Sequence, residues 1–149
     1  SGTVLTDTSP KAGNVLQVVQ GTTSSQTSTT GIVLVDTTLT ATITPSSASS
    51  KILVMVDQSS VGKANADERV RIVLLRNGTT IATLTELAAY NAASQNNDVG
   101  SVTISYFDSP ATTSALVYKT QFSNINNAGS AIVQWNPSLS TITLLEIKQ

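Results

Sequence analysis

The sequence has 149 residues and a formal net charge of −1, with 8 Lys and Arg, 9 Asp and Glu, no Cys and no His. The length suits one domain with its own core, and the charge lacks the basic excess that nucleic-acid binding requires. The missing residue types exclude Cys- and His-based zinc sites, thiol nucleophiles and triads with a histidine base. The longest apolar run is far shorter than a membrane span, so we expect no membrane insertion, and no signal peptide is visible at the N-terminus.

Ten short segments rich in Thr, Val, Ile and Leu follow one another along the chain, separated by turn residues. The predicted strands are 14–20, 31–36, 38–44, 51–57, 69–76, 79–86, 99–107, 114–122, 130–135 and 141–147. This pattern predicts an all-β fold, an antiparallel β-sandwich or a barrel, in a single domain over 1–149 with 1–12 as an extended N-terminal segment. The polar stretch 22–30 indicates a loop or an edge segment, and "ELAAYNAA" (86–93) favours a short helix or a loop.

The turn residues agree with this prediction. Asn77-Gly78 between two apolar runs is a strong hairpin signal, because a two-residue turn needs positive φ at both positions. Pro45, Pro110 and Pro137 fall between the predicted strands, where a proline removes no ladder hydrogen bond.

Two predicted strands, 51–57 and 69–76, are apolar on both faces, whereas the core of one sandwich covers only one face. We therefore expect a homo-oligomer, and specifically a trimer, that covers the second faces. The opposed sets are Leu53 and Met55 against Ile52, Val54 and Val56, and Val73 and Leu75 against Val70, Ile72 and Leu74.

Three short motifs carry possible chemistry, and each has a simpler structural explanation. Asp108 in "DSPATTS" stands before Pro110 as a turn-initiating residue whose side chain caps backbone N–H groups. Asp67 and Glu68 are adjacent carboxylates that we interpret as part of a solvated charged loop. Gly62-Lys63 lacks the remaining residues of a phosphate-binding loop.

The connections between strands give a stronger functional signal. Alternate connections of a meandering sandwich lie at the same end, which groups the long, polar segments 59–68, 87–98 and 123–129 at one end and the tight segments 77–78, 108–113 and 136–140 at the other. Binding residues on β-scaffolds gather on such loops, where amides hydrogen-bond sugar hydroxyls and an aromatic ring can stack on a sugar. The candidate ligand-binding residues are Lys63, Asn65, Asp67, Tyr90, Asn91, Gln95, Asn96, Asn97, Asn124, Asn126 and Asn127. Ordinary exposed loops remain the alternative.

The segments "ITPSSASSKILV" (43–54) and "DSPATTS…YKTQF" (108–122) resemble a domain of tailed-phage virion proteins, abundant in phages of marine cyanobacteria. The resemblance extends from Gly13 to Ile147. It implies a structural or fibre-like virion component without a catalytic motif. The loops 59–68 and 87–98 differ most from the pattern, as expected for surfaces that face a variable partner.

These observations lead to one main hypothesis with two alternatives. The main hypothesis is a non-enzymatic virion protein: a trimeric sandwich of jelly-roll type at the tip of a fibre or tail appendage, attached to host-surface glycan and to other virion proteins, with no cofactor and no metal. The first alternative is a capsid decoration or assembly module with protein partners only. The second is a glycan-degrading enzyme that uses Asp67, Glu68 or Asp98.

Overall fold

The computed structural model describes residues 9–64 and 67–149. Within this part of the chain there is no helix, and so none long enough to cross a membrane. The described strands are β1 (Val15–Thr23), β2 (Thr27–Thr29), β3 (Val35–Ile43), β4 (Lys51–Gln58), β5 (Gly62–Ala64), β6 (Glu68–Arg76), β7 (Thr79–Asn91), β8 (Asn97–Asp98), β9 (Val102–Asp108), β10 (Leu116–Asn124), β11 (Ser130–Val133) and β12 (Ser140–Ile147). Most of the predicted N-terminal segment, residues 1–8, lies outside the described residues, and Ser9–Asn14 precede the first strand.

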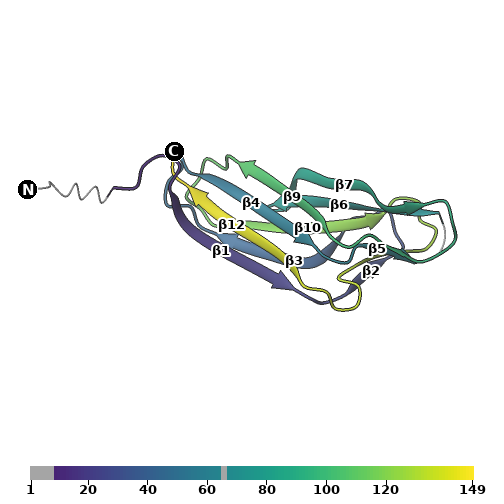
Figure 1. The fold of residues 1–149 in the computed structure, drawn as a ribbon. Coiled ribbons are helices and arrows are strands. Elements are labelled where there is room, and N and C mark those ends of the chain that lie inside the picture. The colour runs from purple at the N-terminus through teal and green to yellow at the C-terminus, as the bar shows by residue number, and fades with distance from the viewer. Residues whose placement is uncertain (1–8, 65–66) are drawn as a thin grey trace, which may run out of the picture.

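Eight of these strands pair in a nested antiparallel order: β1 with β12, β3 with β10, β4 with β9, and β6 with β7. This is the pairing of one long hairpin whose tip is the turn Asn77-Gly78, and both turn residues have positive φ, 47° and 83°. The hairpin is folded over, so that its strands form two four-stranded sheets, sheet I (β1-β12-β4-β9) and sheet II (β3-β10-β6-β7). The predicted all-β, sandwich-like fold and its hairpin turn are confirmed (Figure 1).

A third sheet, the end sheet (β2-β11-β5-β8), caps one end of the sandwich. The start of β1 and the C-terminus lie at the opposite end (Figure 1). We call the end with the end sheet the loop end and the other the compact end. Thr23 of β1 pairs with Ser140 and Val15 pairs with Ile147, which fixes the direction of both strands.

The prediction for the connection 136–140 is wrong. A place for 136–140 at the compact end requires the predicted strand 130–135 to run the full length of a sheet and end there. Instead β11 belongs to the end sheet, and the chain remains at the loop end, where Trp135 N–H donates to the carbonyl of Ser60 and Thr141 pairs with Asp57.

The interior contains two apolar clusters separated by buried polar side chains. Along β10, Tyr118 belongs to the cluster near the compact end and Phe122 to the cluster near the loop end, with Thr120 between them. The Thr120 hydroxyl donates to Gln58 Oε1 (2.8 Å), and Gln58 Nε2 donates to Ser140 Oγ (3.2 Å). These groups are fully buried and satisfy one another's hydrogen bonds, so burying the polar layer costs little free energy. The same hydrogen bonds fix the relative position of the sheets.

Two segments differ from the local prediction. Residues 86–91 continue β7 as a strand, where a helix or loop was expected, because pairing with β6 overrides the helical preference of alanine. Of the predicted strand 31–36 only the last two residues are extended in β3, which runs without interruption through the predicted second strand. The polar stretch 22–30 contains β2, an edge strand of the end sheet.

One premise of the predicted oligomer also needs correction. Val73 and Leu75, on the second face of β6, are 0% and 4% exposed within the single chain. The register places Gln121 and Lys119 of β10 beside them, and long polar side chains cover apolar neighbours with their stems. On β4, by contrast, Met55 is 45% exposed, so of these two strands β4 is the one that leaves apolar side chains uncovered within the described residues.

Asp108 has a structural role, as predicted, through different partners. Its buried carboxylate accepts two hydrogen bonds from Arg76 Nη1 (2.8 and 2.7 Å) and one from the Tyr118 hydroxyl (2.6 Å), in addition to one from the backbone N–H of Ser109. Burial and the neighbouring carboxylate raise the pKa of Tyr118, which therefore remains a donor at any physiological pH. This cluster ties β6, β9 and β10 together at the compact end.

Candidate ligand-binding surface

The three long connections that were predicted to share one end do so. Glu68 at the start of β6 pairs with Asn91 at the end of β7, and Asn124 at the end of β10 pairs with Val70. The described parts of these connections, residues 59–64, 67, 92–96 and 125–129, therefore lie close together at the loop end, within the end sheet or beside it.

A bulge in β7 directs one aromatic side chain outward at this end. Ala88 and Ala89 are both buried, which breaks the alternation of a regular strand, and Ala89 has a φ of 59°. An extra residue of this kind shifts the side chains that follow it to the other face. Tyr90 is thereby left 48% exposed at the loop end.

Tyr90 stands beside a cation, which is in turn hydrogen-bonded to an amide. The guanidinium carbon of Arg69 lies 5.4 Å from the centroid of the Tyr90 ring, a cation–π distance. Arg69 Nε donates to Asn126 Oδ1 (3.1 Å), and Asn126 Nδ2 donates to the backbone carbonyl of Asp67. We call Asp67, Arg69, Tyr90 and Asn126 the Tyr90 cluster, which joins an aromatic ring, a fixed positive charge and an amide from three separate segments.

Two of the predicted site residues are internal supports. Lys63 is fully buried on β5, and its ammonium donates to the backbone carbonyls of Asn91 (3.0 Å) and Ala93 (2.8 Å). Asn124 is also fully buried and donates to the carbonyl of Gly129 (2.9 Å). Both side chains hold loops in place, so neither is on the surface where a ligand would bind.

Glu68 is a third internal support, which corrects its interpretation as a solvated residue. Its buried carboxylate accepts hydrogen bonds from Asn124 Nδ2 and from the backbone N–H groups of Ala128 and Gly129. Gly129 is required here, because a Cβ at that position would lie 2.7 Å from the carbonyl oxygen of Ala64. The loop 125–129 is thus fastened to the start of β6.

The other predicted residues lie around the Tyr90 cluster with different degrees of exposure. Gln95, Asn96 and Asn127 are exposed, and Asn127 has a φ of 55°. Asn91 and Asn97 are half-buried; Asn91 Oδ1 accepts from the N–H of Ala93, and Asn97 Nδ2 donates to the carbonyl of Ala89. Asn65 lies outside the described residues.

The carboxylates at this end are engaged separately. Asp98 accepts from the Ser60 hydroxyl and from the N–H of Gly100 (2.7 Å), as in an Asx-turn, while Glu68 holds the loop 125–129. Among the described residues, no group of three or more acidic, Cys or His side chains could hold a metal ion.

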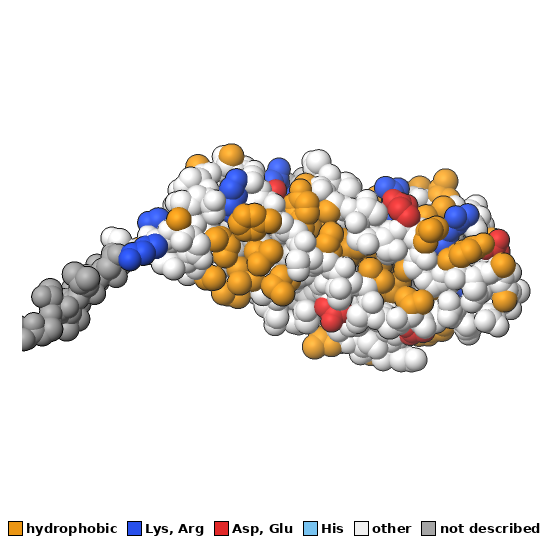
Figure 2. Space-filling model, turned by 45° about the horizontal axis from the view of Figure 1, so that its top comes forward, with side chains coloured by type: hydrophobic (Ala, Val, Ile, Leu, Met, Phe, Trp, Pro, Cys, Tyr) orange, Lys and Arg blue, Asp and Glu red, His pale blue; other side chains and the backbone are white. Residues whose placement is uncertain are grey.

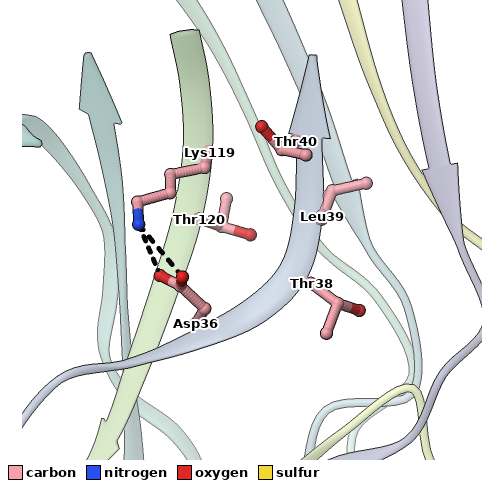
Figure 3. Close-up of a pocket in the computed structure, with 6 residues that line it drawn as sticks. All are labelled: Asp36, Thr38, Leu39, Thr40, Lys119 and Thr120. Atoms are coloured by element: carbon pink, nitrogen blue, oxygen red, sulfur yellow. Dashed lines mark hydrogen bonds and ion pairs between the residues drawn. The ribbon is translucent and has the colours of Figure 1, made fainter. Parts of the chain in front are cut away.

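A separate small cavity, of about 220 Å³, opens between β3 and β10. The register between β3 and β10 shifts between Lys119 and Gln121, so that three residues of β3 lie opposite the single residue Thr120. One of these three residues, Thr38, has a φ of 70°. Figure 3 shows β3 bending away from β10 there, with Lys119 and Asp36 pointing toward one another. Their ion pair (2.8 Å) lies at the rim, and Gln121 Nε2 also donates to Asp36. Both partners lower the pKa of Asp36, Lys119 most strongly, so the rim carboxylate is already shared by two donors.

Sequence reasoning missed Arg69, which is not among the candidate ligand-binding residues predicted from the sequence. The available signal was its place next to the long segment 59–68, at the end of the molecule that also carries Tyr90. Comparison with known proteins adds no family: no family model matches the sequence, and no curated protein matches it.

Proposed function

We propose that the chain is a non-enzymatic phage virion domain that attaches to host-surface glycan through its loop end, as part of a fibre or tail appendage. Residues 1–149 form one domain of jelly-roll type in this proposal. Eight antiparallel strands with nested pairing, divided between two four-stranded sheets, are the arrangement expected of a jelly roll, a common fold in viral proteins and lectins. The resemblance of the segments 43–54 and 108–122 to tailed-phage proteins supports a location in the virion.

The Tyr90 cluster is the observation that carries the proposal. A half-exposed tyrosine offers an apolar ring face and a polar tip, which suits stacking on a sugar ring. Arg69 and Asn126 supply hydrogen-bond donors and an acceptor for hydroxyl groups next to that ring. The loops next to these side chains are held by the buried Lys63, Glu68 and Asn124, so the surface is formed before the ligand arrives.

The position of the cluster supports attachment as well. The described start of the chain and its C-terminus lie at the compact end, and the Tyr90 cluster lies at the opposite end (Figure 1). A domain joined to other virion proteins through its compact end would present the loop end outward.

A glycan array with the purified, fluorescently labelled domain tests the proposal. We expect binding to one class of glycan, and Tyr90→Ala to weaken it about fivefold, the loss of one stacking group. The control is Val117→Ala, which removes a 39% exposed apolar side chain near the Asn77-Gly78 turn and should leave binding unchanged. A parent domain that binds no glycan, or a Tyr90→Ala variant that binds as the parent does, contradicts the proposal.

A capsid decoration or assembly module is the second candidate. Ile32 and Val33, in the segment before β3, are 63% and 73% exposed, and Gly31 next to them accepts a hydrogen bond from Asn124 at the loop end. Adjacent exposed apolar side chains suit a protein partner better than a sugar. Binding to purified virion proteins that is lost in Ile32→Ser with Val33→Ser, without glycan binding, would favour this candidate. Release of reducing ends from a host polysaccharide would instead favour an enzyme.

The trimer predicted from the sequence stays a prediction. Of the two strands behind it, only β4 leaves apolar side chains uncovered within the described chain.

A further inference from the structure

The outer face of sheet I carries a continuous apolar ridge. The register aligns one outward-facing residue from each strand: Val18 of β1 pairs with Leu145 of β12, Leu145 with Leu53 of β4, and Leu53 with Phe107 of β9. Val18 is 58% and Phe107 54% exposed. In Figure 2 hydrophobic side chains gather in a patch toward the compact end.

A hollow lies directly beside the ridge on the same face. It has a volume of about 420 Å³ and is lined mainly by short polar side chains from the next two cross-strand rows. Its outward-facing lining residues are Met55, Asp57, Thr103, Ser105, Thr141 and Thr143. A bulky row next to a hollow row is the shape that a second, reversed copy of the same face would fill.

The charged residues on this face are also arranged so that a reversed copy of the face would complement them. The outward-facing residues of β4 are, in order, Lys51, Leu53, Met55 and Asp57, because the residues between them are buried. One positive and one negative side chain thus bracket two apolar ones. Reversing the strand about the point between Leu53 and Met55 exchanges the two charges and the two apolar residues.

We propose that this face binds a second copy of the chain about a two-fold axis lying in the interface, perpendicular to β4, between Leu53 and Met55. The ridge of each copy then enters the hollow of the other, and Lys51 of one copy lies beside Asp57 of the other. A two-fold contact of this kind is self-complementary and closed. In a parallel arrangement around a three-fold axis, the Lys51 residues of neighbouring copies would instead lie at the same height along that axis. Repulsion between these like charges opposes such an arrangement.

This pairing is independent of what the loop end binds, and it gives the assembly a distinct geometry. Because the two copies run in opposite directions, the pair carries one loop end at each pole. It would replace the predicted trimer, and it would allow one pair to bridge two surfaces.

A charge-exchange experiment by sedimentation equilibrium tests the pairing. The parent should have twice the 15.5 kDa mass of the chain at micromolar concentration. Lys51→Asp and Asp57→Lys each place like charges together twice in the pair, and each should raise the dissociation constant by about tenfold. The double variant should recover the parent value, and an equimolar mixture of the two single variants should form pairs, since each chain then complements the other.

An apolar control separates this face from the rest of the surface. Phe107→Asp places a charge on the ridge and should give a monomer that melts as a folded protein, whereas Val117→Asp, on sheet II, should leave the mass unchanged. A monomeric parent, a three-chain mass, or single variants that do not complement each other in the mixture would overturn the proposal.

Discussion

Glu146 on β12 is fully buried, and its carboxylate is held by polar neighbours at the compact end. It accepts hydrogen bonds from Gln17 Nε2 (2.6 Å) and from the backbone N–H (2.8 Å) and hydroxyl (2.7 Å) of Ser46. Burial alone raises the pKa of a carboxyl, but these hydrogen bonds outweigh burial and lower the pKa of Glu146 from 4.5 to about 2. Its contribution to stability is therefore present above pH 4.5 and is lost as the pH falls toward 2.

This depressed pKa predicts the acid sensitivity of the fold. Between neutral pH and about pH 3 the parent should lose on the order of 2 kcal/mol of unfolding free energy through Glu146 alone. Glu146→Gln removes the titrating group, so the variant should start less stable and lose less on acidification. Urea unfolding at the two pH values measures both quantities, and equal losses for parent and variant would rule out Glu146 as the source.

The elements themselves show how far the sequence determines this fold. Strand positions followed from Thr, Val and Ile content, and the hairpin tip followed from Asn77-Gly78. The failures have physical causes: the Ala-rich segment 86–91 is a strand because β6 offers it backbone partners, and 136–140 lies at the loop end because β11 leaves the sandwich. Neither cause can be predicted from the local secondary-structure propensities of these residues.

The candidate site was predictable only in part for a related reason. The alternation of strand connections placed Tyr90 and its neighbouring amides at one end, as the structure has them. It did not distinguish exposed amides from the buried supports Lys63 and Asn124, since burial depends on which loops pack over them. The bulge at Ala89 that exposes Tyr90 depends on register with β6, which local sequence does not specify.

The hairpin tip gives a prediction at the scale of elements. A Cβ on Gly78 would meet nothing within 4 Å, so its only constraint is a φ of 83°. Gly78→Val should cost about 1–2 kcal/mol of unfolding free energy, and Gly78→Asn less, because asparagine tolerates this conformation. Urea unfolding measures the two costs, and an equal cost would show that backbone strain is not the cause. Glycan binding at the far end should persist in both variants.

The two faces of the central strands give a second prediction at this scale. Leu75→Glu puts a carboxylate where the side chain is 4% exposed, so the chain should fail to fold or melt far below the parent. Met55→Glu, at a 45% exposed position of sheet I, should remain folded as a separated chain. Circular dichroism melts beside light scattering check both outcomes. A folded Leu75→Glu variant would contradict the burial of the second face of β6.

At the scale of the whole molecule, different parts of one sandwich have different roles. The compact end carries the described start of the chain, the C-terminus and the Asp108 and Glu146 networks. The outer face of sheet I carries the ridge and hollow, and the loop end carries the Tyr90 cluster. The buried polar layer at Thr120 and Gln58 separates the two apolar clusters, so a change at one end should have little effect on the packing at the other.

The most direct test of the central claim is an amide-resolved NMR titration of the isotope-labelled domain with the glycan that it binds best on the array. We expect chemical-shift changes concentrated at 67–69, 90–97 and 126–127, with the amides around Asn77-Gly78 and Ser46 unmoved. Changes centred on the compact end or on the cavity between β3 and β10, or no changes with any glycan, would contradict attachment through the loop end.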